Sequence, residues 1–452
     1  FLVEVQEGAV KPIEPVFLDY QKDMSQLKAK SDIPVLYKQN VANDLFQLIY
    51  VFDMGNNHDK ALGTAFDYLE YLGTSDMTPE ELKSEFYRLA CTFYVSPGNE
   101  RTYVVLSGLN ENMPAAVQLF EKLLADAQVN KEAYTNMTSD ILKARSDAKL
   151  NQGQNFSRLM SFAMYGPKSP ATNLLTEAEL TNMNPQELVD RIHNQNSYKH
   201  RILYYGPSSS KDLLATIDQY HQVPATLKDI PAGNEYAYLK TPVTKVLVAP
   251  YDAKQIYMAQ ISNLDKKYDP AIEPIRALYD EYFGGGMNSI VFQEMRETRG
   301  LAYSAWASIM PPSYLKYPYV LRTQIATQND KMIDAVTTFN DIINNMPESE
   351  AAFKLAKDGL TNRLRTERII KGDIIWSYIN AQDLGQNVDP RIKLYNDIQN
   401  MSLKDIVDFQ KQWVKGRTYV YCILGDKKDL ELDKLKAVGP IEELTQEQIF
   451  GY

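Results

Sequence analysis

The sequence is poor in the residues that build disulfide frameworks and metal sites. Its 452 residues include 2 cysteines and 4 histidines. Two cysteines by themselves exclude a disulfide framework and a structural zinc site, and the apolar neighbours of Cys91 and Cys422 predict that both are buried as small hydrophobic residues. No histidine has another histidine four residues away, the spacing that places two imidazoles on one helical face. We therefore expect all four histidines to be surface or packing residues.

The chain also lacks an excess of positive charge and a long apolar run. Its net charge of -10 argues against general nucleic-acid binding, because contact with phosphates requires a basic surface. No apolar stretch approaches the roughly 20 residues that span a bilayer, so no membrane span is expected. Because the sequence starts at Phe1 and not at Met, we interpret it as a processed or truncated piece. An export signal would then lie upstream, which leaves a periplasmic or exported location open.

What the chain does have is a globular composition and an internal repeat. Hydrophobic residues make up 44% and charged residues 23% of the sequence, which suits two domains with separate cores. The segment from Tyr68 to Gly73 recurs as Tyr279 to Gly284, and the amphipathic pattern from Met113 to Leu124 recurs from Met332 to Ile343. These matches predict two homologous domains in tandem.

Each copy mixes strand and helix patterns in the same order. Alternating apolar residues predict strands from Leu45 to Phe52 and from Ile256 to Ile261. Apolar residues at helical spacing predict long helices from Lys131 to Leu150 and from Ala351 to Ile370. The predicted fold is therefore α+β, with two tandem homologous domains, each a largely antiparallel sheet packed with helices on one face.

Segments that contain proline and glycine mark the expected domain boundaries. They divide the chain into a connector from an upstream part (1–34), a first domain (35–222), a linker (223–241), a second domain (242–441) and a polar tail (442–452).

The most informative segment opens with three consecutive glycines: Gly284, Gly285 and Gly286. A predicted amphipathic helix follows and carries Arg296, and Tyr303 stands at the start of the next predicted strand. A phosphate-binding loop is excluded, because a lysine and then a serine or threonine would have to follow the glycines. A tight turn before the helix and the close approach of a substrate backbone are both compatible with glycine.

The spacing Arg296-x6-Tyr303, the tandem domains, and Gly73-Thr74 followed by Met-Thr-Pro-Glu-Glu-Leu resemble the pitrilysin/insulinase metallopeptidases across nearly the whole chain. The resemblance is closest to the C-terminal, non-zinc half of the tandem bacterial enzymes. In that family, an inverted H-x-x-E-H motif on the helix before the Gly-Thr pair holds zinc.

The zinc motif is degenerate in both copies. The matching positions of the first copy are Thr64, Ala65, Phe66, Asp67 and Tyr68, so both histidines are replaced. The repeat places Ile275, Leu278 and Tyr279 at the equivalent positions of the second copy. Catalytic zinc needs three protein ligands, so we expect no cofactor in this chain, and the resemblance implies zinc in a partner half.

The resemblance implies a function for the segment that carries Arg296 and Tyr303. These residues would reach the active site of a zinc-bearing N-terminal half or subunit, bind the peptide main chain and stabilise the oxyanion, with the three glycines lining the substrate path. The chain would then be the substrate-binding half of a zinc metalloendopeptidase that cleaves peptides or small unfolded proteins in an enclosed chamber, and would be inactive alone. The alternative is a catalytically inactive scaffold or assembly subunit with the same fold.

Overall fold

The computed structural model describes residues 13–252 and 255–452. The first part of the expected connector, residues 1–12, lies outside the described residues. Within them, no helix is both long and apolar enough to cross a membrane.

The first copy forms a mixed, largely antiparallel sheet. Its strands are β1 (Ser25–Lys28), β2 (Pro34–Gln39), β3 (Leu45–Phe52), β4 (Cys91–Pro97), β5 (Thr102–Leu109) and β6 (Arg201–Gly206). They lie in the order β1-β2-β6-β3-β5-β4, so β4 is an edge strand. The pairs β1/β2, β3/β5, β3/β6 and β4/β5 are antiparallel, and β2/β6 is parallel.

The second copy repeats this arrangement. Its strands are β7 (Lys245–Pro250), β8 (Gln255–Lys267), β9 (Ser304–Met310), β10 (Pro318–Gln328), β11 (Val420–Gly425) and β12 (Ile441–Glu443). Their order is β12-β7-β11-β8-β10-β9, which matches the first sheet once β1 and β12 are set aside. The β7/β11 pair is parallel, and β10 pairs antiparallel with β8 and β9. The predicted α+β fold of two homologous domains is confirmed.

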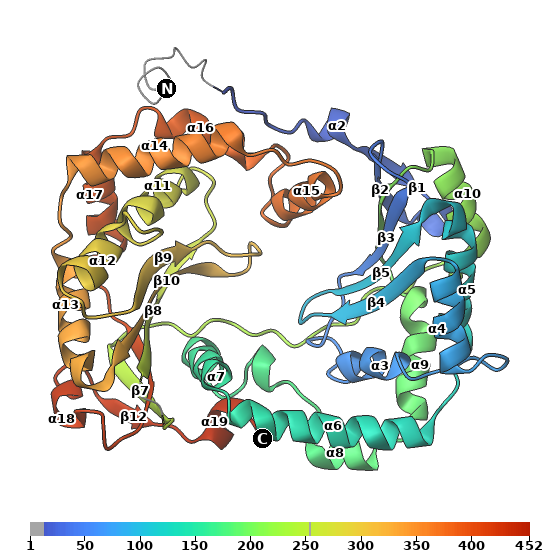
Figure 1. Ribbon diagram of the computed structural model, residues 1–452, viewed down its shortest axis with the longest axis horizontal. Coiled ribbons are helices and arrows are strands. Elements are labelled where there is room, and N and C mark those ends of the chain that lie inside the picture. Colours follow the sequence, from blue (N-terminus) through green and yellow to red (C-terminus); the bar gives the residue numbers. More distant parts are fainter. Residues whose placement is uncertain (1–12, 253–254) are drawn as a thin grey trace, which may run out of the picture. The chain divides into compact units, whose positions relative to one another are not determined.

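Helices α4, α5 and α10 lie along one side of the first sheet (Figure 1). The apolar residues of β3, such as Phe46 and Leu48, join these helices in one core. The helices of this part are α2 (Tyr20–Asp23), α3 (Leu62–Leu69), α4 (Pro79–Arg88), α5 (Met113–Asp126), α6 (Lys131–Lys149), α7 (Gln152–Tyr165), α8 (Glu177–Asn182), α9 (Gln186–Asn194) and α10 (Ser210–Tyr220), with short 3-10 turns η1 (Lys30–Asp32), η2 (Asn110–Asn112), η3 (Pro170–Thr172) and η4 (Gln195–Ser197).

Helices α11 and α12 lie beside β9 of the second sheet (Figure 1). The helices of the second copy are α11 (Glu273–Phe283), α12 (Ile290–Phe292), the π-helix η5 (Gln293–Thr298), the 3-10 turn η6 (Asn329–Lys331), α13 (Met332–Asn344), α14 (Glu350–Thr366), α15 (Asp373–Asp383), α16 (Pro390–Ile398), α17 (Leu403–Trp413), α18 (Leu432–Leu435) and α19 (Gln446–Phe450).

The contacts divide the described residues into two compact units that do not follow the repeat boundary. One unit holds residues 13–19, 255–370 and 377–419, and the other holds 20–252, 371–376 and 420–452. In the latter unit, α7 packs on β7 and β11, although it belongs to the first copy in sequence. Helix α19 packs on α7 and buries Ile449 and Phe450, so the C-terminal residues contribute to a core. Cys91 and Cys422 are buried, as predicted, and neither is part of a disulfide.

Candidate functional site

The glycine segment follows α11, and a buried carboxylate fastens α11 to β9. Asp280 accepts hydrogen bonds from the backbone amide of Ile309 (2.9 Å) and from the Ser308 hydroxyl (2.8 Å), and it pairs with Arg276 (2.8 Å). Burial raises the pKa of Asp280 to about 6, and the Arg276 guanidinium acts in the opposite direction. The end of α11 is therefore held against the edge strand of the second sheet.

The three glycine positions differ in how much space they leave for a side chain. A Cβ atom on Gly284 would lie 2.2 Å from the Ala307 carbonyl oxygen, so the backbone of β9 excludes any side chain there. A Cβ atom on Gly285 would lie 2.8 Å from the Asp280 carbonyl oxygen. A Cβ atom on Gly286 would meet nothing within 4 Å. The first two glycines allow the chain's own backbone to pack closely, and only Gly286 leaves space for a ligand to approach.

The residues after the glycines form a broken helix where a regular amphipathic helix was expected. Helix α12 gives way to the π-helix η5, which buries Met295 and carries Arg296 on the exposed side. Gly300 ends the turn in a left-handed conformation with φ of 58°, and the Leu301 amide donates to the Met295 carbonyl at 2.9 Å. Such π-type turns are rare in proteins overall, but those that occur are often found at functional sites. Helical periodicity alone does not predict them.

The structure brings Arg296 and Tyr303 together. The Tyr303 amide donates to the Ala326 carbonyl at 3.1 Å, beside the last pair of β9 and β10, which joins Ser304 to Ala326. The Arg296 guanidinium carbon lies 5.4 Å from the centre of the Tyr303 ring and 5.0 Å from that of Phe292, which is cation–π geometry. The Arg296 side chain is 43% exposed and Tyr303 is 74% exposed. Both polar groups can thus meet a ligand from solvent.

The positions that match the zinc motif do not fit zinc. Ala65, Phe66 and Tyr68 on α3 are buried in the core, and the Tyr68 hydroxyl donates to the Asn130 carbonyl at 2.6 Å. In the second copy, Tyr279 is buried and its hydroxyl donates to the side chain of Gln410. Across the part of the chain that the structure describes, no three His, Cys, Asp or Glu side chains are grouped to hold a metal.

Burial also acts on the carboxylate at the glutamate position of the motif. It raises the pKa of Asp67, and the charge of nearby Glu70 adds to the effect.

Two histidines that are distant in sequence meet in the first copy. His200 Nε2 lies 2.8 Å from His221 Nε2, and His221 Nδ1 lies 2.6 Å from the buried carboxylate of Glu121. His200 Nδ1 contacts the Tyr198 carbonyl at 2.7 Å. Burial, with His221 nearby, lowers the pKa of His200 to about 3. Sequence reasoning missed this cluster, because tertiary packing, including that of α10 on α5, brings the three residues together.

Comparison with known proteins relates part of the chain to a known family. Residues 204–360 match the model of the peptidase M16 inactive domain. The chain carries an M16 inactive domain. This confirms the expected relationship to the zinc metallopeptidases in its non-zinc form, and the matched region contains the glycines, Arg296 and Tyr303.

Two curated relatives support the M16 assignment. The non-peptidase homolog YmxG of Helicobacter pylori is 23% identical over 447 residues, which are 95% of this chain and 99% of that protein. An uncharacterized zinc protease of Rickettsia felis is 20% identical over 263 residues, which are 55% of this chain and 60% of that protein. The chain is therefore similar both to a protein named a non-peptidase and to one named a protease.

Solved structures show the same fold. A peptidase M16 inactive domain from Pseudomonas fluorescens superposes with a TM-score of 0.69 at 15% identity and covers 89% of this chain and 98% of its own. The periplasmic protease PqqL of Escherichia coli gives a TM-score of 0.70 at 13% identity, covering 93% of this chain. The ferredoxin protease FusC, solved with Arabidopsis ferredoxin, gives 0.68 at 12% identity. This chain spans 48% of the PqqL and FusC chains.

Proposed function

We propose that this chain is the non-zinc half of an M16 zinc endopeptidase, and that it presents Arg296 and Tyr303 to a peptide bound at the zinc of a partner half. The observation that carries the proposal is the exposed Arg296–Tyr303 pair on a well-anchored loop. The Thr327 hydroxyl donates to the Leu301 carbonyl at 2.6 Å, and the Lys331 ammonium contacts the Gly300 carbonyl at 3.1 Å. The loop is therefore positioned by its backbone, and both functional side chains remain available.

The two side chains suit a developing oxyanion. A guanidinium and a phenol are both strong hydrogen-bond donors, and donors held in place before the reaction lower its barrier because they need no reorganisation. The nearest carboxylate to Arg296 is Glu297 at 3.6 Å, and both groups are exposed, so this ion pair is weak. A peptide carbonyl can displace it at little cost in free energy. The substrates of the assembled enzyme would be peptides or small unfolded proteins enclosed between the two halves.

A second candidate function is a non-catalytic scaffold or assembly subunit with the same fold. One specific observation favours it: the relative that aligns over 95% of this chain is named a non-peptidase homolog. The scaffold has no oxyanion to bind, so it predicts that Arg296 and Tyr303 can be replaced without a functional effect.

Reconstitution tests the proposed function. This chain and a zinc-bearing M16 chain of the same organism are purified separately and mixed, and complex formation, zinc content and cleavage of an unfolded protein are measured. We expect no cleavage and no stoichiometric zinc with this chain alone, and cleavage with one zinc per complex after mixing. A complex that forms and holds zinc without cleaving supports the scaffold, and stoichiometric zinc on this chain alone contradicts both functions.

A further inference from the structure

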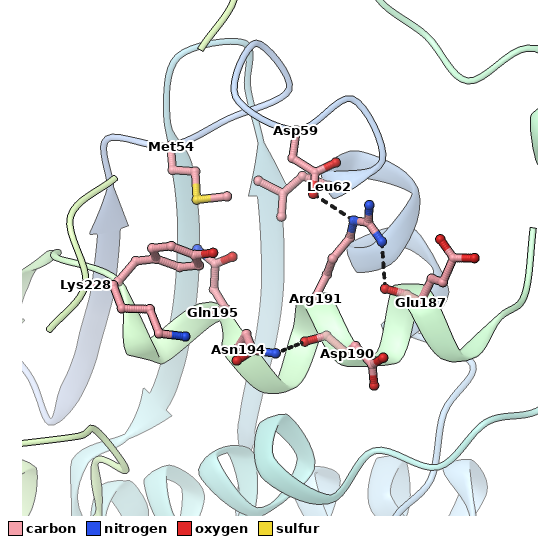
Figure 2. Close-up of a pocket in the computed structure, with 10 residues that line it drawn as sticks. Met54, Asp59, Leu62, Glu187, Asp190, Arg191, Asn194, Gln195 and Lys228 are labelled. Atoms are coloured by element: carbon pink, nitrogen blue, oxygen red, sulfur yellow. Dashed lines mark hydrogen bonds and ion pairs between the residues drawn. The ribbon is translucent and has the colours of Figure 1, made fainter. Parts of the chain in front are cut away.

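A small cavity lies beside α9 in the first copy, far in sequence from Arg296 and Tyr303. Its volume is about 360 Å³, near the lower end of the range of roughly 300–1,000 Å³ that is typical of ligand pockets. The buried side chains of Met54 and Leu62 form its apolar wall. The other lining residues are polar or aromatic: Asp59, Glu187, Asp190, Arg191, Asn194, Gln195, Tyr198 and Lys228 (Figure 2).

Gln195 is the most informative residue of this cavity. Its side chain is 1% exposed, and neither its amide nitrogen nor its amide oxygen has a hydrogen-bond partner in the structure. Figure 2 shows this amide between Lys228 and Arg191, below the Met54 sulfur. A buried polar group without a partner costs about 1–3 kcal/mol. The adjacent Asn196 instead donates to the Glu121 carboxylate at 2.9 Å, so η4 is held in place independently of Gln195.

The charges are separated along the cavity. Lys228 lies at one end in Figure 2, and Glu187 lies at the other, with Gln195 between them. The Lys228 ammonium sits 5.7 Å from the centre of the Tyr198 ring, and the Lys228 backbone is fixed because its amide donates to the Ser197 carbonyl at 2.8 Å. The cavity therefore has a cationic end and an anionic end.

The arginine of the cavity is already neutralised at the anionic end. Arg191 donates to the Asp59 carboxylate at 2.7 Å and to the Glu187 carbonyl at 2.8 Å. The Glu187 carboxylate and Asp190 are exposed next to this pair. They leave negative charge available for a cationic group of a ligand.

We propose that this cavity binds the zwitterionic form of a dipeptide. The ligand carboxylate would lie at Lys228, its peptide group on the Gln195 amide, and its ammonium beside Glu187 and Asp190. A glutamine amide offers both donors and an acceptor, and a peptide group matches it with one N–H and one C=O. A phosphate or a simple carboxylate offers only acceptors, and an amine offers only donors, so either would leave one atom of Gln195 unpaired.

Calorimetric titration of the intact chain with L-alanyl-L-alanine tests this proposal. The measurement needs no zinc-bearing half, so its outcome is independent of the proposed peptidase function. We expect binding by the natural chain, and no binding of the dipeptide when its amine is acetylated and its carboxylate is amidated. The Gln195→Leu and Lys228→Met chains should each bind at least about tenfold more weakly, an effect of one or two lost polar contacts.

Lys199→Met is the matched control. Lys199 follows Tyr198 in the sequence but pairs with Asp229 and lines a different cavity, so its loss should leave dipeptide binding unchanged. Because Lys228 is exposed, its substitution tests the site even if Gln195→Leu fails to fold. The proposal is overturned if the natural chain shows no binding at millimolar dipeptide, if both site variants bind as well as the natural chain, or if a crystal soaked with dipeptide shows only water at Gln195.

Discussion

The two copies of the fold place different pairs of side chains at the same turn. In the first copy, Phe86 on α4 and Phe93 on β4 are separated by six residues, and their rings lie 4.9 Å apart. In the second copy, Arg296 and Tyr303 have the same spacing, and the guanidinium lies 5.4 Å from the ring. Each pair surrounds one residue with positive φ, which is Ala90 (48°) in the first copy and Gly300 (58°) in the second.

The difference shows that the fold does not require a charged pair at this turn. Phe86 is 5% exposed and Phe93 also packs on Phe120, with ring centres 4.8 Å apart, so the first copy uses its pair as core. The second copy exposes a guanidinium and a phenol where apolar side chains would stabilise the fold more. Polar side chains that add little to stability are best explained by a ligand, which supports our proposal that this turn binds substrate in the second copy and is structural in the first.

The largest expected effect is a difference in the free energy of unfolding between variants of the two pairs. Phe86→Ala should lower the free energy of unfolding by about 3–5 kcal/mol, because a buried phenyl ring is lost. Arg296→Ala should lower it by at most about 1 kcal/mol, the value of an exposed cation–π contact. Denaturant unfolding of both variants measures the two changes. Equal losses would show that Arg296 is as structural as Phe86, and would remove the basis of the comparison.

The next largest effect is on catalysis in the assembled enzyme. Arg296→Ala should reduce kcat by about 10²–10³, the usual result of removing one oxyanion donor. The control is Arg299→Ala: Arg299 lies one turn along, is 44% exposed and pairs only weakly with Glu294 at 3.5 Å. Steady-state kinetics should show near-normal turnover for the control. An equal loss from both variants would mean that general charge, and not the Arg296 position, affects activity.

Acid should weaken the first copy more than the second, because all four histidines lie in the first. The pKa of His200 is about 3 in the fold, against 6.5 for an ordinary histidine. Between these two values the unfolded chain therefore binds more protons than the folded chain. The stability that the buried, neutral His200 contributes is complete above pH 6.5 and is lost as the pH falls towards 3. The groups facing His200 are His221, Tyr50, Phe52 and the Tyr198 carbonyl.

Denaturant unfolding between pH 7 and pH 4.5 measures this contribution as the difference between the natural chain and His200→Gln. The natural chain should lose more stability than the variant over this range. His193→Gln is the control for the loss of a histidine at an exposed position. Parallel pH dependences of the natural chain and His200→Gln would contradict the assigned burial effect.

The smallest effect concerns the two residues with positive φ. Gly300→Ala should destabilise the chain by about 1–2 kcal/mol, the cost of a left-handed backbone for a residue with a Cβ atom. No atom lies within 4 Å of that Cβ position, so the cost is one of backbone conformation and not of a clash. Ala90→Gly relieves the same strain and should be close to neutral. Thermal unfolding measures both changes. If Gly300→Ala and Ala90→Gly destabilised the chain equally, the positive φ would not explain both effects, and the two turns would not be equivalent.

Local patterns predicted the elements of the fold well. The strand from Leu45 to Phe52 coincides with β3, and the helix predicted from Lys131 to Leu150 ends one residue beyond α6. Both succeed because a half-buried strand and an amphipathic helix impose different apolar periods. The repeat then predicted that the second sheet has the strand order of the first.

Features that depend on distant contacts were not predictable. The backbone approach of Ala307 that requires glycine at Gly284 is visible only once β9 is in place. The pairing of His200 with His221, the packing of α7 on β11 and the unpartnered amide of Gln195 likewise arise from tertiary packing. For the candidate site, the sequence pattern identified Arg296 and Tyr303, and the structure adds their proximity and exposure. Their catalytic role stays a prediction.

The most direct test of that role is the turnover of the assembled enzyme with Tyr303→Phe, measured together with its zinc content. The matched control is Tyr94→Phe, because Tyr94 is an exposed tyrosine on the edge strand β4 of the first copy. Our account predicts that Tyr303→Phe lowers kcat by about 10²–10³ with zinc content unchanged, and that Tyr94→Phe retains normal turnover. Normal turnover with Tyr303→Phe would contradict the account and favour the scaffold.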